Sequence, residues 1–240
     1  MKAFNCQVLG IEPLSDNIYQ IRLISRNPEF YQFEAGQYLM LQMPQGDPVP
    51  LSIASPPQQK NYIELHLRLM PAPSLSAQIL EYLQWNQVAI MLGPLGQCFL
   101  RNPDKQNIFI AGGTGYSPMK SMMESAFEAD FCGSIHLFLG ADQSSDLYHH
   151  QYLLDYTASE QNFRYTPVIA KPDNHWSGEI GFPHQLAINE YAKELTSKDF
   201  YIAGSEAMVM AVYNDLLNNG VSKSQIFSDI LDIKRENGEL

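Results

Sequence analysis

The sequence predicts a two-domain protein in which an antiparallel β-domain, residues 1–102, precedes an α/β domain with a parallel sheet, residues 103–240. Two observations support this fold class. In the first half, short runs that alternate apolar and polar residues are separated by proline and glycine, which is typical of antiparallel strands. In the second half, short apolar runs alternate with stretches of helical period, which is typical of βαβ units.

We expect the strands of the first domain at residues 4–9, 18–23, 38–43, 63–70 and 88–92, and one helix at residues 75–85. Many strands with a single helix indicate a small antiparallel barrel or a sandwich. Residues 93–96, with the sequence GPLG, end this domain, and the polar residues 101–105 connect it to the next one.

In the second domain we expect strands at residues 108–111, 135–140, 164–170 and 200–203, and helices at residues 118–127, 148–156, 182–194 and 206–218. Ligands of such sheets bind beyond the carboxyl ends of the strands. Three strand ends carry glycine, at residues 112–117, 140–142 and 204–206. These three segments are therefore candidate binding segments.

The stretch NIFIAGGTGYSPMKSMME, residues 107–124, carries the most chemical information. A buried strand runs into glycines that turn the backbone and let it approach a ligand closely. Ser117 is an N-cap residue type and Pro118 suits the first helical position, so the helix should start at Pro118 and its N-terminus would favour an anionic group. Pro118 also occupies the third glycine position of the G-x-G-x-x-G fingerprint, so that pattern is not met. The alternative is that the glycines only turn the chain.

Composition narrows the classes of partner. A formal net charge of −11 and a pI near 4.9 argue against a nucleic-acid partner. Three distant cysteines fit neither a disulfide framework nor a metal site, which favours a reducing compartment. No signal peptide and no apolar run of membrane-spanning length is recognisable, so we expect a cytoplasmic protein without a membrane span.

Five motifs, in their order along the chain, resemble those of the ferredoxin–NADP reductase superfamily, and within it those of the small bacterial NAD(P)H–flavin oxidoreductases. They are EAGQYL at residues 34–39, PLSIAS at residues 50–55, GPLG at residues 93–96, AGGTGYSP at residues 111–118, and YIAG at residues 201–204 with Met208. The resemblance covers nearly the whole chain and implies a Greek-key flavin-binding barrel followed by a pyridine-nucleotide-binding domain. It further implies an enzyme that transfers a hydride from NADH or NADPH to FMN, FAD or riboflavin bound between the domains.

By this resemblance, Ser52 is the candidate catalytic residue, because its hydroxyl would be offered to flavin N5. The backbone of Leu51 and Ile53, in the same motif as Pro50, would support the flavin ring. The alternative for Ser52 is a hydroxyl that satisfies a local turn.

The same resemblance assigns the nucleotide to the segment after the first strand of the second domain. The residues that would hold it are Gly112, Gly113, Thr114, Gly115, Ser117 and Pro118. Gly204 and Met208 would let the nicotinamide lie against the flavin. Met208 taken alone, at helical spacing, would more often be a core residue.

Val49 departs from the family pattern, because the flavin motif usually begins with an arginine that meets the flavin phosphate. A valine cannot form such a charge-assisted hydrogen bond. Arg68 could compensate, although a solvated outward-facing arginine is equally compatible with the sequence. Weak flavin binding would suit an enzyme that uses flavin as a diffusible substrate, and it would also suit a protein that has lost flavin.

Asp142 is a second departure, because the family often places here an arginine that reaches the adenosine 2′-phosphate. A carboxylate would repel that phosphate and could accept from a 2′-hydroxyl, and no lysine or arginine lies between Lys120 and Arg164. We therefore expect NADH to be preferred, with NADPH as the alternative cofactor. Asp142 could instead cap the turn before the next helix. Near the chain end, residues 226–229 resemble a final strand. Its Asp229 could approach the cofactor junction or be a surface carboxylate, and we expect the latter.

Three hypotheses for function follow from these residues. The first is NADH-dependent reduction of free flavin. The second is an electron-transfer component that retains its flavin and docks to an oxygenase or another electron acceptor protein. The third is a flavin-reductase-like module that has lost catalysis. No cysteines with the C-x4-C-x2-C ferredoxin spacing occur, so the acceptor would be free or on another protein.

Overall fold

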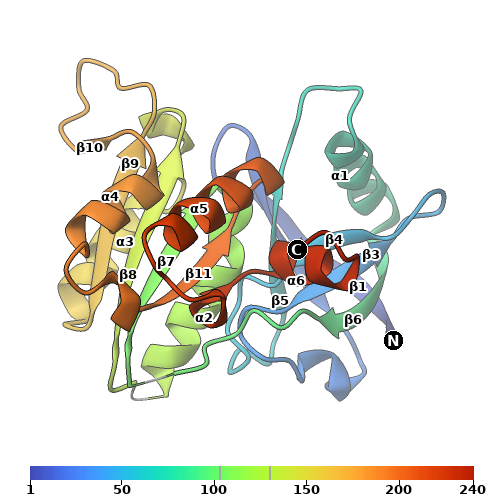
Figure 1. The fold of residues 1–240 in the computed structure, drawn as a ribbon. Coiled ribbons are helices and arrows are strands. Elements are labelled where there is room, and N and C mark those ends of the chain that lie inside the picture. The colour runs from blue at the N-terminus through green and yellow to red at the C-terminus, as the bar shows by residue number, and fades with distance from the viewer. Residues whose placement is uncertain (103, 130) are drawn as a thin grey trace.

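The computed structural model describes residues 1–102, 104–129 and 131–240, which form a β-barrel and a parallel sheet covered by helices (Figure 1). The barrel strands are β1 (Lys2–Pro13), β2 (Ile18–Ile24), β3 (Tyr38–Gln42), β4 (Val49–Ser52), β5 (Ile63–Arg68) and β6 (Val88–Leu95). They pair antiparallel in the order β4-β3-β6-β1-β2-β5. A bridge between Ile53 and Leu65 joins the two edge strands, so the barrel is nearly closed. Helix α1 (Leu75–Asn86) and the short 3₁₀ helix η1 (Pro28–Tyr31) complete this domain.

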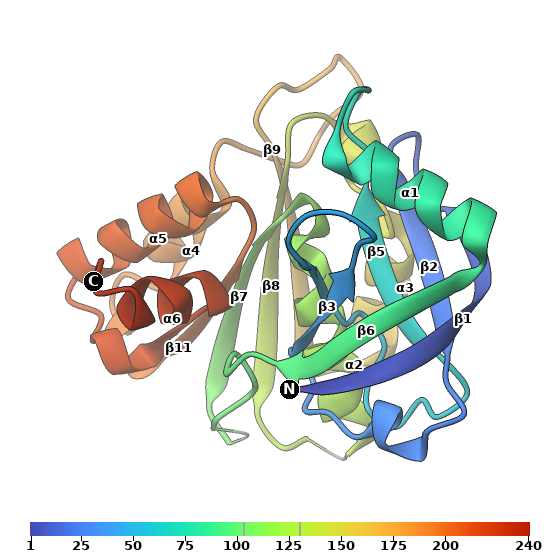
Figure 2. The ribbon, with the colours of Figure 1, turned by 90° about the vertical axis from the view of Figure 1, so that its right-hand side faces the viewer.

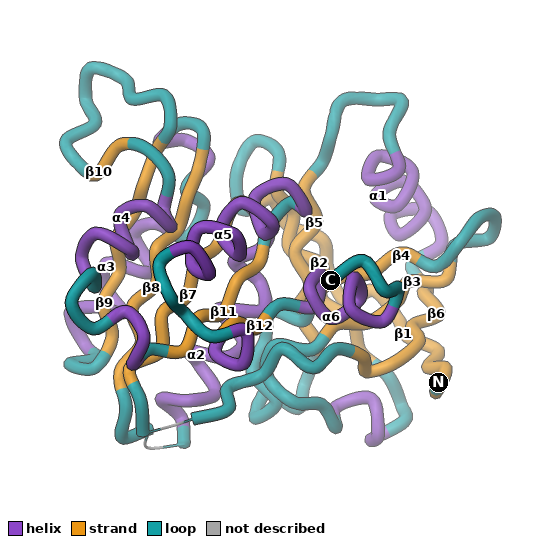
Figure 3. The backbone as a smooth tube through the Cα atoms, in the orientation of Figure 1, coloured by secondary structure: helices purple, strands orange, loops and turns teal. Residues whose placement is uncertain are grey.

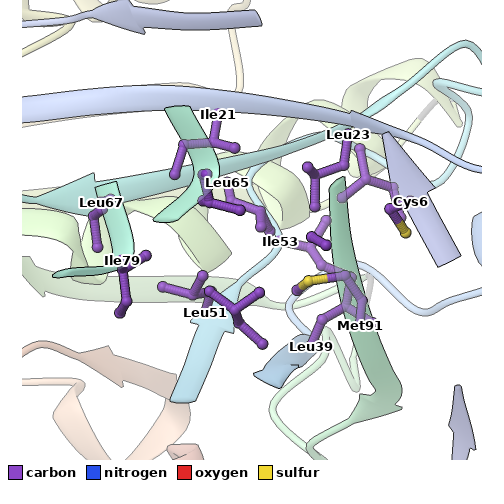
Figure 4. Close-up of a cluster of buried hydrophobic side chains, with 14 of the residues drawn as sticks. Cys6, Ile21, Leu23, Leu39, Leu51, Ile53, Leu65, Leu67, Ile79 and Met91 are labelled. Atoms are coloured by element: carbon purple, nitrogen blue, oxygen red, sulfur yellow. The ribbon is translucent and has the colours of Figure 1, made fainter. Parts of the chain in front are cut away.

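The barrel core consists of side chains that alternate along the strands (Figure 4). Ile21 and Leu23 of β2 are buried, whereas Arg22 between them is partly exposed. Leu39 of β3 and Leu65 of β5 fill the same interior. A shift of one residue along a strand would turn these buried side chains outward, so their burial fixes the register of the barrel strands.

The second sheet is parallel and has the strand order β10-β9-β8-β7-β11-β12. Its strands are β7 (Gln106–Gly112), β8 (Ser134–Ala141), β9 (Phe163–Ile169), β10 (Glu179–Ile180), β11 (Asp199–Ala203) and β12 (Ile226–Phe227). Its helices are α2 (Tyr116–Glu128), α3 (His150–Ser159), α4 (Pro183–Glu190), α5 (Glu206–Asn218) and α6 (Asp229–Glu236). Short 3₁₀ helices are η2 (Gly113–Gly115), η3 (Ser144–Asp146), η4 (Leu195–Ser197) and η5 (Lys223–Gln225).

Helices cover both faces of this sheet. Figure 2 shows α4, α5 and α6 on the face away from the barrel, and α2 and α3 pack on the other face. Along β7, Phe109 and Ala111 pack toward α2, while Ile108 and Ile110 pack toward α5. Burial on both faces explains why this strand is a continuous apolar run. Figure 3 shows the loop between β9 and β10 extending from one end of the sheet.

The structure confirms the predicted fold class, a barrel followed by a parallel α/β domain, and the sandwich alternative is wrong. The predicted boundary after residue 102 falls beside residue 103, which lies outside the described residues. Among the helices of the described ranges, none combines the length and apolar character needed to cross a bilayer.

The predicted start of the helix at Pro118 is wrong. Helix α2 begins at Tyr116 and its N-cap position is Gly115, because the 3₁₀ turn of η2 runs directly into it. Pro118 therefore lies within the first turn, where its missing N–H costs no intrahelical hydrogen bond. Strand β4 was not among the predicted strands, because proline at position 50 obscures its alternation.

Candidate functional site

Three connected pockets lie where the carboxyl ends of β7, β8 and β11 face the barrel strands β4 and β5. We call them the sheet-end pocket, of about 630 Å³, and the junction and barrel pockets, of about 390 Å³ each. Gly112 and Gly113 line both the sheet-end and junction pockets, and Ser52 and Thr114 line both the junction and barrel pockets. Arg68 lines all three. This continuous cleft is the candidate site, because parallel sheets bind ligands beyond their carboxyl ends.

The sheet-end pocket is shaped by glycines at the ends of β7 and β8. A Cβ on Gly112 would lie 2.6 Å from Met208 Sδ, and a Cβ on Gly140 would lie 2.9 Å from Pro183 Cγ. Helices α4 and α5 supply the opposite wall of the pocket, so a side chain at either glycine would collide with it. The absent Cβ atoms therefore let α5 and α4 pack closely against the ends of β7 and β8, and this packing shapes the pocket.

Asp142 lines the sheet-end pocket and is exposed. Its Oδ2 lies 2.9 Å from Lys171 Nζ, and the Lys171 backbone N–H donates to the Asp142 carbonyl. Lys171 lies beyond the interval from Lys120 to Arg164, so the sequence did not predict it beside Asp142. The parallel pairing of β8 with β9 brings it there. The turn that follows is capped by Gln143, so the interpretation of Asp142 as its cap is wrong.

The junction pocket is formed by the start of α2 and the end of β11. Thr114, Gly115 and Pro118 lie on one side of it, and Gly204 on the other. A Cβ on Gly115 would lie 2.2 Å from the Ala203 carbonyl oxygen, so α2 begins in tight contact with β11. No side chain caps the N-terminus of α2. The Tyr116 N–H already donates to the Gly113 and Thr114 carbonyls, but the helix dipole at this end still favours an anionic group.

Asp229, at the start of α6, also lines the junction pocket, so the expectation of a surface carboxylate is wrong. The Gln97 backbone N–H donates to its Oδ1 at 3.2 Å. Burial raises the pKa of Asp229 to about 6, although hydrogen bonds from the backbone of Cys98 and Gln97 oppose the shift. Asp229 follows β12, so its place beyond a strand end agrees with the alternative that it approaches the cofactor junction.

The barrel pocket lies between β4, β5 and the first turn of α1. Pro50, Leu51 and Ser52 line it on one side, and Ser74 and Ser76 line it at the start of α1. Within the described residues the Ser52 hydroxyl makes no hydrogen bond, so it does not satisfy a local turn. It is therefore available to a ligand in either the junction or the barrel pocket.

Arg68 ends β5, opposite Ile18 of β2, and its side chain is exposed at the meeting point of the three pockets. A Cβ on Gly113 would lie 3.3 Å from Arg68 Nη1. Among the described residues lining these pockets, Arg68 is the only lysine or arginine. It forms no ion pair within the described ranges. Both sequence alternatives therefore hold in part, since the guanidinium is solvated and also faces the cleft.

The structure brings most of the predicted site residues to this cleft. Those that line it are Pro50, Leu51, Ser52, Arg68, Gly112, Gly113, Thr114, Gly115, Ser117, Pro118, Asp142, Gly204 and Met208. Ile53 is the exception, because its side chain is fully buried in the barrel core. Sequence reasoning named Asp229 but favoured its surface alternative, and it missed Lys171, Ser74 and Ser76.

Comparison with known families and proteins agrees with this architecture. Residues 5–99 match the oxidoreductase FAD-binding domain family, and residues 109–214 match the oxidoreductase NAD-binding domain family. The NAD(P)H-flavin reductase of Vibrio harveyi is 32% identical over 234 residues, covering 93% of this chain and 96% of that protein. The CDP-6-deoxy-L-threo-D-glycero-4-hexulose-3-dehydrase reductase of Yersinia pestis is 32% identical over 228 residues, covering 95% of this chain and 68% of the relative.

Solved structures share the fold. The ferredoxin reductase of carbazole 1,9a-dioxygenase has a TM-score of 0.82 at 24% identity, over 95% of this chain and 69% of that one. A ferredoxin NADP⁺ reductase from Neisseria gonorrhoeae has a TM-score of 0.77 at 22% identity, over 95% and 98% of the two chains. The resemblance inferred from the motifs is thus confirmed. This chain belongs to the ferredoxin–NADP reductase superfamily, as an oxidoreductase with an FAD-binding barrel domain and an NAD-binding α/β domain.

Proposed function

We propose that this protein is an NADH:flavin oxidoreductase that transfers a hydride from NADH to FMN, FAD or riboflavin, with the flavin acting as a diffusible substrate. The observation that carries the proposal is the junction pocket, which Ser52 of the barrel and Gly204 of the parallel sheet line together. A nicotinamide from one side and a flavin from the other would meet there. Positioning of this kind is the main contribution a protein makes to hydride transfer between cofactors.

On the nucleotide side, the residues present fit a dinucleotide. Gly112 and Gly140 line the sheet-end pocket that would receive it, and the uncapped N-terminus of α2 suits its pyrophosphate. Thr114, Gly115 and Pro118 would hold that part of the ligand. Asp142 would face the adenosine ribose, which favours NADH, although Lys171 beside it gives NADPH a partner for its extra phosphate.

On the barrel side, the residues present fit a flavin ring more closely than a flavin phosphate. When bound, the flavin supplies the hydride acceptor, N5, and the free Ser52 hydroxyl would donate to that atom. Pro50 and Leu51 would support the ring, and Ile53 would hold their strand from within the core. Among the described residues that line the cleft, Arg68 is the single lysine or arginine available to a phosphate. A single cation, which also lines the nucleotide pockets, would hold the flavin only weakly.

A second candidate function is that of a reductase component that passes electrons to a partner protein. It is favoured by the anthranilate 1,2-dioxygenase electron transfer component of Acinetobacter baylyi, which is 32% identical over 225 residues. The chain spans about two thirds of that relative, 65% of its length. Val49 opposes this function, because a retained flavin calls for strong phosphate contacts. Either activity suits a reducing compartment such as the cytoplasm, where NADH and flavin are present together.

The test is NADH oxidation with and without added riboflavin or FMN, on protein purified without flavin. Saturable oxidation that depends on flavin, on a protein that is colourless as purified, is expected. Ser52→Ala should lower the rate by about 10²-fold while NADH affinity stays unchanged, and Ser52→Thr should restore part of the rate. A yellow protein with tightly held flavin would favour the reductase-component function. The absence of turnover in folded protein would refute both activities.

A further inference from the structure

Met208, in the first turn of α5, lies at the boundary between the sheet-end and junction pockets. The residue lines the sheet-end pocket and is half-buried. Its sulfur lies 2.6 Å from the position that a Cβ on Gly112 would take, and 2.7 Å from that of a Cβ on Gly204. Both glycines line the junction pocket. The sulfur therefore packs against the backbone at the ends of β7 and β11, in the wall of the cleft.

The position of Met208 is held from two sides. Its backbone N–H donates to the hydroxyl of Ser205, the N-cap residue of α5, at 3.3 Å. Its side chain packs against the core cluster that α5 forms with the parallel sheet. Because the backbones of Gly112 and Gly204 already contact the sulfur, an atom added to it either enters the cleft or displaces the side chain. Both results change the wall of the nucleotide pocket.

The other methionines have different surroundings. Met1 and Met70 are exposed, and Met40 and Met210 are half-buried. Among the described residues that line the three pockets of the cleft, the methionines are Met208 and Met70. Met70 lines the barrel pocket, so Met208 is the methionine of the nucleotide side. The remaining five are at most 8% exposed: Met43, Met91, Met119, Met122 and Met123.

The cysteine of the junction pocket does not offer a comparable site for oxidation. Cys98 lines this pocket but is 3% exposed. Burial, together with the nearby charge of Asp229, raises the pKa of its thiol well above the usual range. The thiolate is the reactive form of cysteine, so this thiol reacts slowly. A thioether has no proton to lose, and the reactivity of Met208 therefore depends on its access to the oxidant.

The proposed activity supplies an oxidant at the cleft. Hydride transfer from NADH produces reduced flavin, which meets O₂ when no acceptor consumes it. O₂ then takes two electrons and two protons from the reduced flavin, which regenerates oxidised flavin and forms hydrogen peroxide. Peroxide is thus produced close to the nucleotide pocket when reduced flavin accumulates.

We propose that Met208 is an oxidation site at which hydrogen peroxide forms methionine sulfoxide and so weakens dinucleotide binding. The sulfur donates an electron pair to one peroxide oxygen, an S–O bond forms, and the O–O bond breaks. The other oxygen takes both protons and leaves as water, so the sulfur loses two electrons and the peroxide gains two. The source of the peroxide rests on the proposed function, whereas the reactivity of Met208 does not.

Oxidation changes the nucleotide pocket in two ways. The sulfoxide adds an oxygen to a sulfur that is already packed against Gly112 and Gly204, and it makes an apolar side chain polar. Overpacking of this kind is destabilising, so NADH should bind about tenfold more weakly. Methionine sulfoxide reductases reverse the reaction. The modification therefore acts as a reversible brake on NADH consumption.

The first test treats flavin-free protein with hydrogen peroxide and stops the reaction with catalase. Mass spectrometry of peptides measures the sulfoxide at each methionine, and titration of NADH fluorescence measures the affinity. We expect the affinity to fall by about tenfold in step with oxidation of Met208. Methionine sulfoxide reductases A and B together should restore it, since each acts on one sulfoxide epimer. NAD⁺ present during the treatment should slow oxidation of Met208 and leave that of Met70 unchanged.

The two methionines of the cleft provide matched variants, Met208→Leu and Met70→Leu. Each variant is compared with its own untreated sample, so a change in its starting NADH affinity does not affect the result. After peroxide, Met70→Leu should lose NADH affinity as wild type does, and Met208→Leu should keep its starting affinity. Thermal unfolding checks that both variants are folded. If Met208→Leu does not fold or bind NADH, the restoration of wild type by the reductases decides the matter.

The added-peroxide test overturns the proposal if Met208 stays unoxidised while Met1 and Met70 react, or if its oxidation leaves NADH affinity unchanged. Loss of affinity in Met208→Leu equal to that in wild type would also overturn it, because another residue would be responsible.

The source of the peroxide is tested separately, by NADH oxidation with riboflavin in air, with and without catalase. Catalase should preserve the rate over many turnovers in wild type, and an equal decline in both samples would overturn the feedback. A wild type that reduces no flavin would refute the proposed function and this source of peroxide. The oxidation of Met208 would then be accepted or rejected on the added-peroxide test alone.

Discussion

The two sides of the cleft are built from different parts of the chain. The nucleotide side is made of backbone, with Gly112, Gly115 and Gly140 at positions where a Cβ would overlap neighbouring atoms. The barrel side is made of side chains, chiefly the Ser52 hydroxyl and the Arg68 guanidinium. A backbone surface is fixed by the fold, whereas a side-chain surface changes with single substitutions. Ligand selectivity should therefore be easier to alter on the barrel side.

The largest effect is expected from breaking the backbone-built side with Gly115→Ala. The new Cβ would lie 2.2 Å from the Ala203 carbonyl oxygen and 2.6 Å from the Gly204 nitrogen, and neither atom can move without shifting β11. We expect a loss of about 3 kcal/mol in the free energy of unfolding, and a loss of NADH binding because the start of α2 is displaced. Urea denaturation and NADH titration measure the two effects.

Gly10→Ala is the matched control for that substitution. Gly10 lies in β1, and an added Cβ there would come no closer than 3.4 Å to the end of the Arg22 side chain. Stability should change little and NADH binding should persist. If Gly115→Ala behaved like Gly10→Ala, the nucleotide side would be more adaptable than the structure implies.

The backbone-built side was also the easier one to predict from sequence. Glycines between an apolar strand and a helix have few interpretations, and the segment from Gly112 to Pro118 lies in the cleft as expected. The cation at Lys171 reaches the site only through the pairing of β8 with β9. A contact of that kind, between residues distant in the chain, leaves no local pattern, whereas Asp229 could be named from its place after the final strand.

The second prediction concerns Arg68, the only lysine or arginine among the described residues that line the barrel pocket. Arg68→Ala should weaken FMN binding by about tenfold, since one charge-assisted hydrogen bond is lost, and leave riboflavin binding nearly unchanged. Val49→Arg tests the converse, because it places a guanidinium at the start of β4 and should strengthen FMN binding by a similar factor. Flavin fluorescence titrations measure both. Equal effects on riboflavin and FMN would mean that Arg68 does not meet a phosphate.

The third prediction uses the titration of Asp229, which lies between the two sides. Its pKa is raised from 3.8 to about 6 in the folded protein, so the folded state binds more protons than the unfolded state in this range. The stability contributed by protonated Asp229 is complete below pH 3.8 and is lost as the pH rises through about 6. Asp229→Asn should remove this decline, as measured by urea midpoints over that range. Asp155→Asn, at an exposed position of α3, should leave the decline in stability unchanged.

The barrel side shows why sequence alone was insufficient there. Val49 stands where the motif usually has an arginine, but the exposed Arg68 could be assigned to the cleft only from the contact between β5 and η2. The prediction for Ile53 concerned its backbone, and the structure shows that its side chain points into the barrel core, where the residue bridges to Leu65. A one-residue step along a strand reverses the direction of a side chain, so a motif alone does not determine which residues face a pocket.

The smallest effect is expected at the adenosine end, where the nucleotide side does depend on side chains. Asp142 and Lys171 form an exposed ion pair, and exposed pairs contribute little free energy. Replacing either residue should therefore change the free energy of NADH binding by no more than about 1 kcal/mol. Asp142→Asn removes the repulsion and frees Lys171, and should shift the ratio of kcat/KM values toward NADPH by about fivefold. Lys171→Ala should shift it toward NADH. If both variants moved the ratio in the same direction, the two side chains would not act as opposing determinants, and the preference for NADH would have to come from the backbone-built part of the pocket.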